Sequence, residues 1–226
     1  MALYMNGQEI SQSSGVPILG ATKPYIEEIY NSDGQLISAN MHGYDAIRSY
    51  MFSDCTKLAL NSLPSGITSI GKNAFQNCTN LALNSLPSGI TSINISTFEN
   101  CSNLALTSLP SGITSIKNNA FYSCTKLALT SLPSGLTSIG RDAFYYCPNL
   151  ALTSLPSGLT DIGNNAFEKC TGLTSITFTG TPTSIGNRAF SNCTNLRTIN
   201  VPWASGAVAN APWGATNATI NYGYAG

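Results

Sequence analysis

Residues 58–80, LALNSLPSGITSIGKNAFQNCTN, form a 23-residue unit that recurs through most of the chain. Four near-copies follow without a gap, and a looser sixth copy, LTSITFTGTPTSIGNRAFSNCTN, comes next. The unit starts are Leu58, Leu81, Leu104, Leu127, Leu150, Leu173 and Leu196. A fixed period of this length is the signature of a solenoid, in which each turn packs only on its neighbours. The repeat therefore predicts one elongated domain of stacked turns.

Each unit can be interpreted as a coil of three short segments separated by corners. Leu58 to Leu63 is a candidate strand that Pro64 ends, and Ser65-Gly66 forms a turn because Gly tolerates tight corners. Ile67 to Ile70 is a second extended segment. Asn73 to Cys78 has apolar residues at helical spacing and is expected to form a helical or 3-10 turn. Stacked in register, the turns pair in parallel at about 4.8 Å, so that like residues form ladders.

The leucines of the first segment leave one question of register open. Simple alternation cannot bury Leu58, Leu60 and Leu63 on the same face. Either Leu60 and its equivalents point inward through an irregular bend, or they form an exposed apolar stripe. We expect the inward orientation, because an exposed leucine ladder over five turns would promote aggregation.

The seven cysteines all occupy one place in the repeat. They are Cys55, Cys78, Cys101, Cys124, Cys147, Cys170 and Cys193. Disulfide frameworks pair cysteines at varied positions, and zinc sites use closely spaced pairs; neither pattern is present. Because free Cys behaves as a small buried hydrophobe, we expect a ladder of reduced thiols facing the core, with no metal and no cofactor.

Composition and charge exclude several classes of partner. Only 9% of the 226 residues are charged and the formal net charge is zero, so the basic stripe that nucleic acid requires is not expected. No apolar run approaches the roughly 18–20 residues that span a bilayer, so membrane insertion is not expected either. The N-terminal MALYMNGQEIS lacks the basic and apolar regions of a secretory signal peptide.

The two ends of the chain depart from the repeat. Residues 1–24 are expected to form a hairpin, with Asn6-Gly7 as its turn, and a linker. Residues 25–57 form an N-terminal cap, with a hairpin from Tyr25 to Ala39 and a degenerate first turn. Six repeats occupy residues 58–195. Residues 196–226 form a C-terminal cap, in which the two tryptophans of the chain, Trp203 and Trp213, cover the last turn.

The repeated motif resembles the BspA-like leucine-rich repeats of the Treponema pallidum type. The motif is L-x-x-x-x-L-P-x-x-I-x-x-I-G-x-x-A-F-x-x-C-x-x-L, and it extends over about residues 44–202. The resemblance implies a leucine-rich-repeat solenoid, a right-handed coil with short parallel strands, short helical or 3-10 turns and a cap at each end. The chain departs from the family at the fourth position, where the family has Ile. The residues at that position here are Asn61, Asn84, Thr107, Thr130 and Thr153.

The residue types that catalysis requires are scarce. His42 is the only histidine, and its neighbours indicate a loop in the cap. A Ser-His-Asp triad would have to use His42, and no GxSxG motif supports one. Glu27 and Glu28 would project to opposite faces of a strand. The resemblance agrees, because it implies repeat residues without a catalytic role. We expect no enzyme.

Candidate binding residues lie where the units differ from one another. The two residues after each Phe vary, and three of them form a small aromatic patch, Tyr122, Tyr145 and Tyr146. Exposed Tyr can stack on a sugar or anchor a protein partner. The second candidate is a row of hydroxyls on the exposed side of the strand ladder, made by Ser62, Ser85, Ser108, Ser131 and Ser154.

These observations favour a non-catalytic binding or adhesion module that presents the solenoid surface to a protein or glycan. The resemblance implies display on a bacterial cell surface or a phage particle, since similar repeats occur in both settings. The alternative is a structural subunit or spacer of a larger, phage-tail-like assembly, attached and oligomerised through residues 1–24. Without a recognisable signal peptide, a cytoplasmic location stays open.

Overall fold

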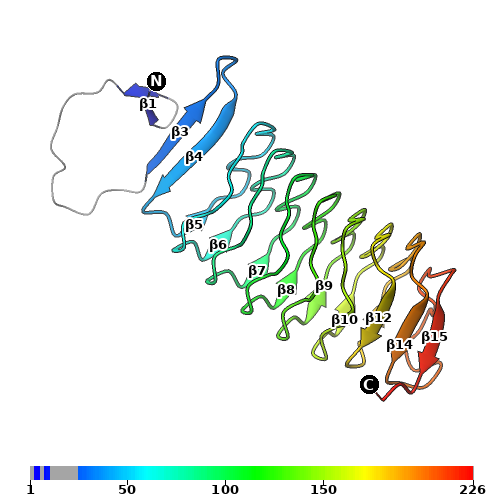
Figure 1. Ribbon diagram of the computed structural model, residues 1–226. Helices are drawn as coiled ribbons and strands as arrows, with labels where there is room; N and C mark the ends of the chain where they lie inside the picture. Colours follow the sequence, from blue (N-terminus) through cyan, green and yellow to red (C-terminus); the bar gives the residue numbers. More distant parts are fainter. Residues whose placement is uncertain (1–2, 6–7, 11–24, 226) are drawn as a thin grey trace.

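The computed structural model describes residues 3–5, 8–10 and 25–225 of the chain. These residues form a solenoid whose turns stack side by side from the N-terminal hairpins to the C-terminal strand (Figure 1). The turn expected at Asn6-Gly7 and the linker expected over 11–24 lie outside the described residues. The parallel pairing of equivalent residues, 23 positions apart, confirms the predicted solenoid.

Two antiparallel hairpins precede the coil. In the first, β1 (Leu3–Met5) pairs with β2 (Gln8–Ile10). In the second, β3 (Tyr25–Tyr30) pairs with β4 (Leu36–His42), which confirms the hairpin predicted here. β1 lies beside β3 (Figure 1). The pairing of β3 with β4 shifts register next to Tyr30, where one extra residue on β4 makes a bulge.

Most turns contribute a two-residue strand at the Ser-Ile step that precedes the Phe turn. These strands pair in parallel along the coil and bury their Ile. They are β5 (Ala46–Ile47), β6 (Ser69–Ile70), β7 (Ser92–Ile93), β8 (Ser115–Ile116), β9 (Ser138–Ile139), β11 (Asp161–Ile162) and β13 (Ser184–Ile185). A second sheet forms toward the C-terminus, on the leucine side of the coil. It contains β10 (Ser154–Leu155), β12 (Ser175–Phe178), β14 (Thr198–Val201) and β15 (Thr219–Tyr222).

The prediction of a strand over Leu58 to Leu63 is wrong for the first four copies, where this segment has no regular strand pairing. The segment is irregular because Leu60 points inward. This orientation confirms the expectation that the leucine enters the core through an irregular bend. Leucines one, three and six of the unit are directed inward, and this uneven spacing breaks the alternation that a strand needs. In the sixth copy, Ile176 and Phe178 alternate regularly, so β12 extends over four residues.

The segment from Asn73 to Cys78 is a run of tight turns, and the described residues contain no helix. Asn73 and Asn77 have positive φ angles of 56° and 61°, which interrupt any helical path. Alternate amides bond within and between turns. Gln76 N–H donates to the Asn73 carbonyl, and Phe75 N–H donates to the Thr97 carbonyl of the next turn. The predicted helical or 3-10 turn is therefore replaced by turns that also pair along the coil.

The core consists of ladders of identical side chains. Neighbouring Phe rings stack nearly parallel, with centroids 5.3–5.7 Å apart from Phe52 to Phe190. At the C-terminal end, Phe178 packs edge-on against Trp203, and the Trp213 carbonyl accepts the Phe190 N–H at 3.0 Å. One turn earlier, the Phe167 N–H donates the equivalent hydrogen bond to the Ala189 carbonyl. Trp213 thus completes the hydrogen bonding of the last regular turn.

Candidate functional site

The buried cysteines are structural. Each thiol donates a hydrogen bond to a Phe carbonyl of the preceding turn, as from Cys78 Sγ to the Phe52 oxygen at 2.9 Å. The same bond recurs in every later turn up to Cys193. Burial raises the pKa of Cys78, Cys147 and Cys193 to about 12. The thiols are free, as predicted, and poor nucleophiles, because the reactive species is the thiolate.

His42 lies at the end of β4, with its Nε2 3.9 Å from Oε2 of Glu27. The Glu27 carboxylate also accepts a hydrogen bond from Asn40 at 3.1 Å. Over the described residues, no group of three His, Cys, Asp or Glu side chains is placed to hold a metal ion. In the same part of the chain, no helix has the length and apolarity to cross a membrane.

The structure brings the predicted tyrosines together. Tyr122 and Tyr145 occupy equivalent positions in adjacent turns, and their rings stack with centroids 4.8 Å apart and an interplanar angle of 5°. Tyr146 is the next residue along the chain, and it is 46% exposed. Burial, and then the neighbouring Tyr145, raise the pKa of the Tyr122 hydroxyl. In the stack, one face of each ring is covered by the other ring.

The sequence pattern did not single out three cations that lie in the same run of Phe turns, of which Lys169 contacts the stack. Lys169 Nζ donates to the Tyr145 hydroxyl at 2.6 Å and lies 4.8 Å from the ring centroid. That hydrogen bond is the main reason why the pKa of Lys169 is raised. Arg188 Nη2 pairs with Oε1 of the buried Glu168 at 2.7 Å.

The third cation, Arg141, pairs through Nε with Oδ2 of Asp142 at 2.9 Å. We call the whole set the aromatic–cationic surface. It consists of Tyr122, Arg141, Tyr145, Tyr146, Lys169 and Arg188. Aromatic residues and Arg are enriched in protein interfaces. A signal was present in the sequence, because three of the ten Lys and Arg residues lie in the Phe turns between residues 141 and 188.

The predicted serines form a continuous row on another part of each turn. Ser62, Ser85 and Ser108 are exposed, and so is Ser131, whereas Ser154 is half-buried within β10. The sheet register continues the row through Thr177, Asn200 and Asn221. Asn200 Nδ2 donates to the Thr177 hydroxyl at 3.1 Å, and Asn221 Nδ2 donates to the Asn200 amide oxygen at 2.8 Å.

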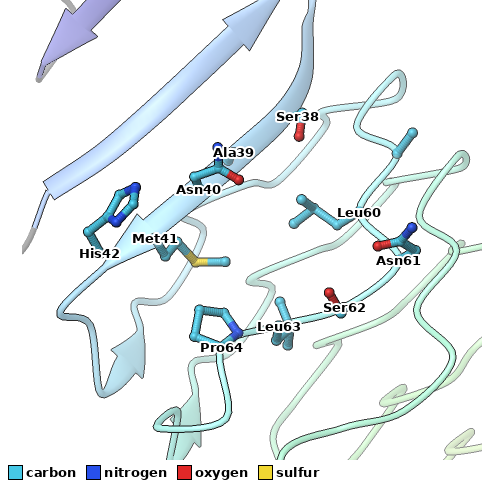
Figure 2. A pocket seen from close by; sticks show the side chains of 11 residues that line it. Ser38, Ala39, Asn40, Met41, His42, Leu60, Asn61, Ser62, Leu63 and Pro64 are labelled. Atoms are coloured by element: carbon cyan, nitrogen blue, oxygen red, sulfur yellow. The ribbon is translucent and has the colours of Figure 1, made fainter.

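Two hollows lie along this leucine-and-serine side of the coil. The larger is a groove of about 480 Å³ between β4 and the first repeat, and Figure 2 shows the two walls facing each other. Ser62 lines it. The smaller, about 240 Å³, includes Ser154 and Thr179. No tyrosine of the aromatic–cationic surface lines either hollow, so the structure does not combine the two predicted sets of binding residues into one site.

Comparison with solved structures places this fold among bacterial leucine-rich repeat proteins. A leucine-rich cell surface protein from Faecalibacterium prausnitzii A2-165 is 21% identical, with a TM-score of 0.51 over 84% of this chain and 72% of that one. A leucine-rich repeat protein from T. pallidum is 24% identical, with a TM-score of 0.44 over 78% and 81% of the two chains. No curated protein matches the sequence.

Comparison with protein families gives a match over most of the coil. The model of the BspA-type leucine-rich repeat region matches residues 28–151 and 103–210, in six copies. This span contains the Phe and Cys ladders and the paired Ser-Ile strands described above. The chain belongs to the BspA-type leucine-rich repeat family.

Proposed function

We propose that this protein is a non-catalytic binding module and that the aromatic–cationic surface contacts a protein partner. The observation that carries the proposal is the Tyr122–Tyr145 stack, held beside Lys169 by a 2.6 Å hydrogen bond. Tyr and Arg are the residue types that dominate binding energy at protein interfaces. The ladder residues are committed to packing, so the variable turn positions are free to serve recognition.

A protein suits this surface better than a glycan does. Sugars stack on open aromatic faces, whereas Tyr122 and Tyr145 turn a face toward each other. The outward groups are hydroxyls, ring edges and the Arg141 and Arg188 guanidinium groups, whose side chains are 67% and 61% exposed. Such groups complement carboxylates and backbone carbonyls. Display on a bacterial cell surface or a phage particle is part of the proposal, and the F. prausnitzii neighbour is described as a cell surface protein.

The test compares two exposed tyrosines in the same backbone conformation. Tyr146→Ser removes a residue of the aromatic–cationic surface, whereas Tyr50→Ser removes a tyrosine at the other end of the coil. Both residues have positive φ, 55° and 62°. Lys72 lies over the Tyr50 ring, so the control also has a nearby cation.

The probes are intact bacterial cells, immobilised matrix proteins and a glycan array. We expect saturable binding to a cell or protein probe, which Tyr146→Ser weakens about tenfold or more and Tyr50→Ser leaves within about twofold. Equal losses in the two variants, or no saturable binding to any probe, would contradict the proposal.

A further inference from the structure

The groove between β4 and the first repeat exposes hydrogen-bonding backbone. Its floor is apolar, with Ala39, Met41 and Leu60 largely buried. Its walls carry small polar side chains from β4 and from the first repeat, and Figure 2 shows Ser38 and Asn40 on β4 opposite Asn61 and Ser62. The groove exists because β4 and the repeat separate after a single shared hydrogen bond, from the Ala59 N–H to the Ile37 carbonyl at 2.9 Å.

That one bond determines where the next backbone groups of β4 point. A trans peptide places its carbonyl and its N–H on opposite sides. The Ile37 carbonyl faces the repeat, so the Ser38 N–H faces β3. Backbone groups alternate from one residue to the next along a strand. The N–H and carbonyl of Ala39 and of Met41 therefore face away from β3 and into the groove.

These groups lack the partners that later turns provide. Between the first and second repeats, two bonds join the corresponding segments, from Ala82 N–H to the Leu60 carbonyl and from Asn84 N–H to the Asn61 carbonyl. Only the first bond has a counterpart at β4. Within the described part of the chain, no hydrogen bond outside the β3–β4 pairing involves the backbone of Ala39 or Met41, and the Asn61 N–H donates none. They form an open strand edge.

We propose that this groove binds an extended peptide segment of a partner protein, which adds as a strand to the edge of β4. A peptide backbone supplies alternating N–H and carbonyl groups that match those of Ala39 and Met41. His42 is the one titratable side chain among the described residues that line the groove, so we expect the side chains of the bound segment that face the groove to be uncharged. From Ser38 to His42 the edge extends about 13 Å, enough for about four residues.

This site is separate from the aromatic–cationic surface, so each proposal can fail without the other. The probe is a library of random octapeptides displayed on phage and selected on the full chain. Ser62→Trp fills the groove from an exposed wall position. The matched control is Ser85→Trp, at the same place in the next turn, which is also exposed and lies outside the groove.

We expect selected peptides to be uncharged at their centre and to bind the wild type and Ser85→Trp equally. Ser62→Trp should bind them at least about tenfold more weakly. In amide exchange followed by NMR, Ala39 and Met41 should exchange rapidly in the free protein and become protected when the peptide is bound. N-methylation of alternate peptide amides should abolish binding, because recognition depends on the backbone.

Three results would overturn the proposal. The first is failure to select any peptide that distinguishes Ser62→Trp from Ser85→Trp. The second is binding that survives N-methylation or that protects amides elsewhere in the chain. The third is a dimer of the full chain that Ser62→Trp dissociates, because a second copy would then be the occupant of the groove.

Discussion

Two residues in each Phe turn adopt the left-handed backbone conformation, and this pattern was not visible in the repeat alone. Asn favours this conformation more than other side chains that carry a Cβ. The second of the two positions also forms a side-chain ladder, in which Asn77 donates to Asp54 and Asn100 donates to Asn77, each at 2.7 Å. The ladder stops at Ser123, and Tyr146 and Lys169 occupy the next two places in the same conformation.

The interruption at Ser123 gives a prediction for stability. Ser123→Asn should extend the side-chain ladder from Asn100, and Asn tolerates the left-handed backbone conformation at this position better than Ser does. The free energy of unfolding should therefore rise by about 0.5–1.5 kcal/mol. Urea unfolding followed by circular dichroism measures the change. Ser102→Asn, in the preceding turn of the coil and without a positive φ, is the control and should give no gain. Lower stability in Ser123→Asn would contradict the explanation of the ladder.

The buried thiols predict a loss of stability at alkaline pH. The folded state raises the pKa of Cys147 from its ordinary value of 9.0 to about 12, chiefly through burial. The folded protein therefore holds the proton when the unfolded chain has lost it. This contribution is complete below pH 9 and is lost as the pH rises from 9 to 12, at about 1.4 kcal/mol per pH unit for each thiol.

Urea unfolding at pH 8, 9.5 and 11 tests this dependence. Cys147→Ala should be less stable than the wild type at pH 8, because a packed thiol and its hydrogen bond are lost. Between pH 9.5 and 11, the free energy of unfolding of Cys147→Ala should fall less steeply with pH than that of the wild type. The difference should equal the contribution of one thiol. An identical slope in the two proteins would show that Cys147 ionises equally in both states.

At the scale of the element, the corners at Gly163 and Gly186, after β11 and β13, depend on close approach of two turns. A Cβ on Gly163 would clash with the backbone at Arg141, and one on Gly186 would clash with the backbone at Asn164. Gly163 N–H also donates to the Ile139 carbonyl of the preceding turn at 2.8 Å. The corner at Gly135 is different, because a Cβ there would meet nothing within 4 Å.

These two corners form a matched pair of variants. Gly163→Ala should lower the free energy of unfolding by about 1–3 kcal/mol, because the turns must move apart. Gly135→Ala should be neutral or slightly stabilising, because only the unfolded chain loses freedom. Asn94 and Lys117 occupy the position of Gly163 in two other turns. The backbone can therefore adapt to a side chain at this position, which limits the loss of stability. Equal stabilities of the two variants would refute the steric argument.

At the scale of the whole molecule, the 23-residue period was enough to predict the solenoid, the Phe and Cys ladders and the inward Leu60. Those features depend only on residues repeated in register. The strand over Leu58 to Leu63 and the helical turn after Asn73 were predicted wrongly, because both depend on backbone angles that the apolar pattern does not encode. The contact of Lys169 with Tyr145 and the groove beside β4 arise between turns, where residues distant in sequence meet.

The Phe ladder makes a prediction for the whole coil. Phe98→Ala, in the middle of the stack, should lower the free energy of unfolding by about 3–5 kcal/mol through the cavity that it leaves. Because each turn contacts only its neighbours, amide exchange should increase most in the turns that adjoin residue 98. A neutral Phe98→Ala would show that the ladder is not the core.

The central claim is that the coil is a scaffold and that the aromatic–cationic surface makes the contact with the partner. Site-specific photo-crosslinking on the bound cell or protein probe tests it most directly, with p-benzoylphenylalanine in place of Tyr146 in one variant and of Tyr50 in the other. We predict a crosslinked partner from position 146 and none from position 50. Crosslinks from position 50 alone, or from both positions equally, would contradict the claim.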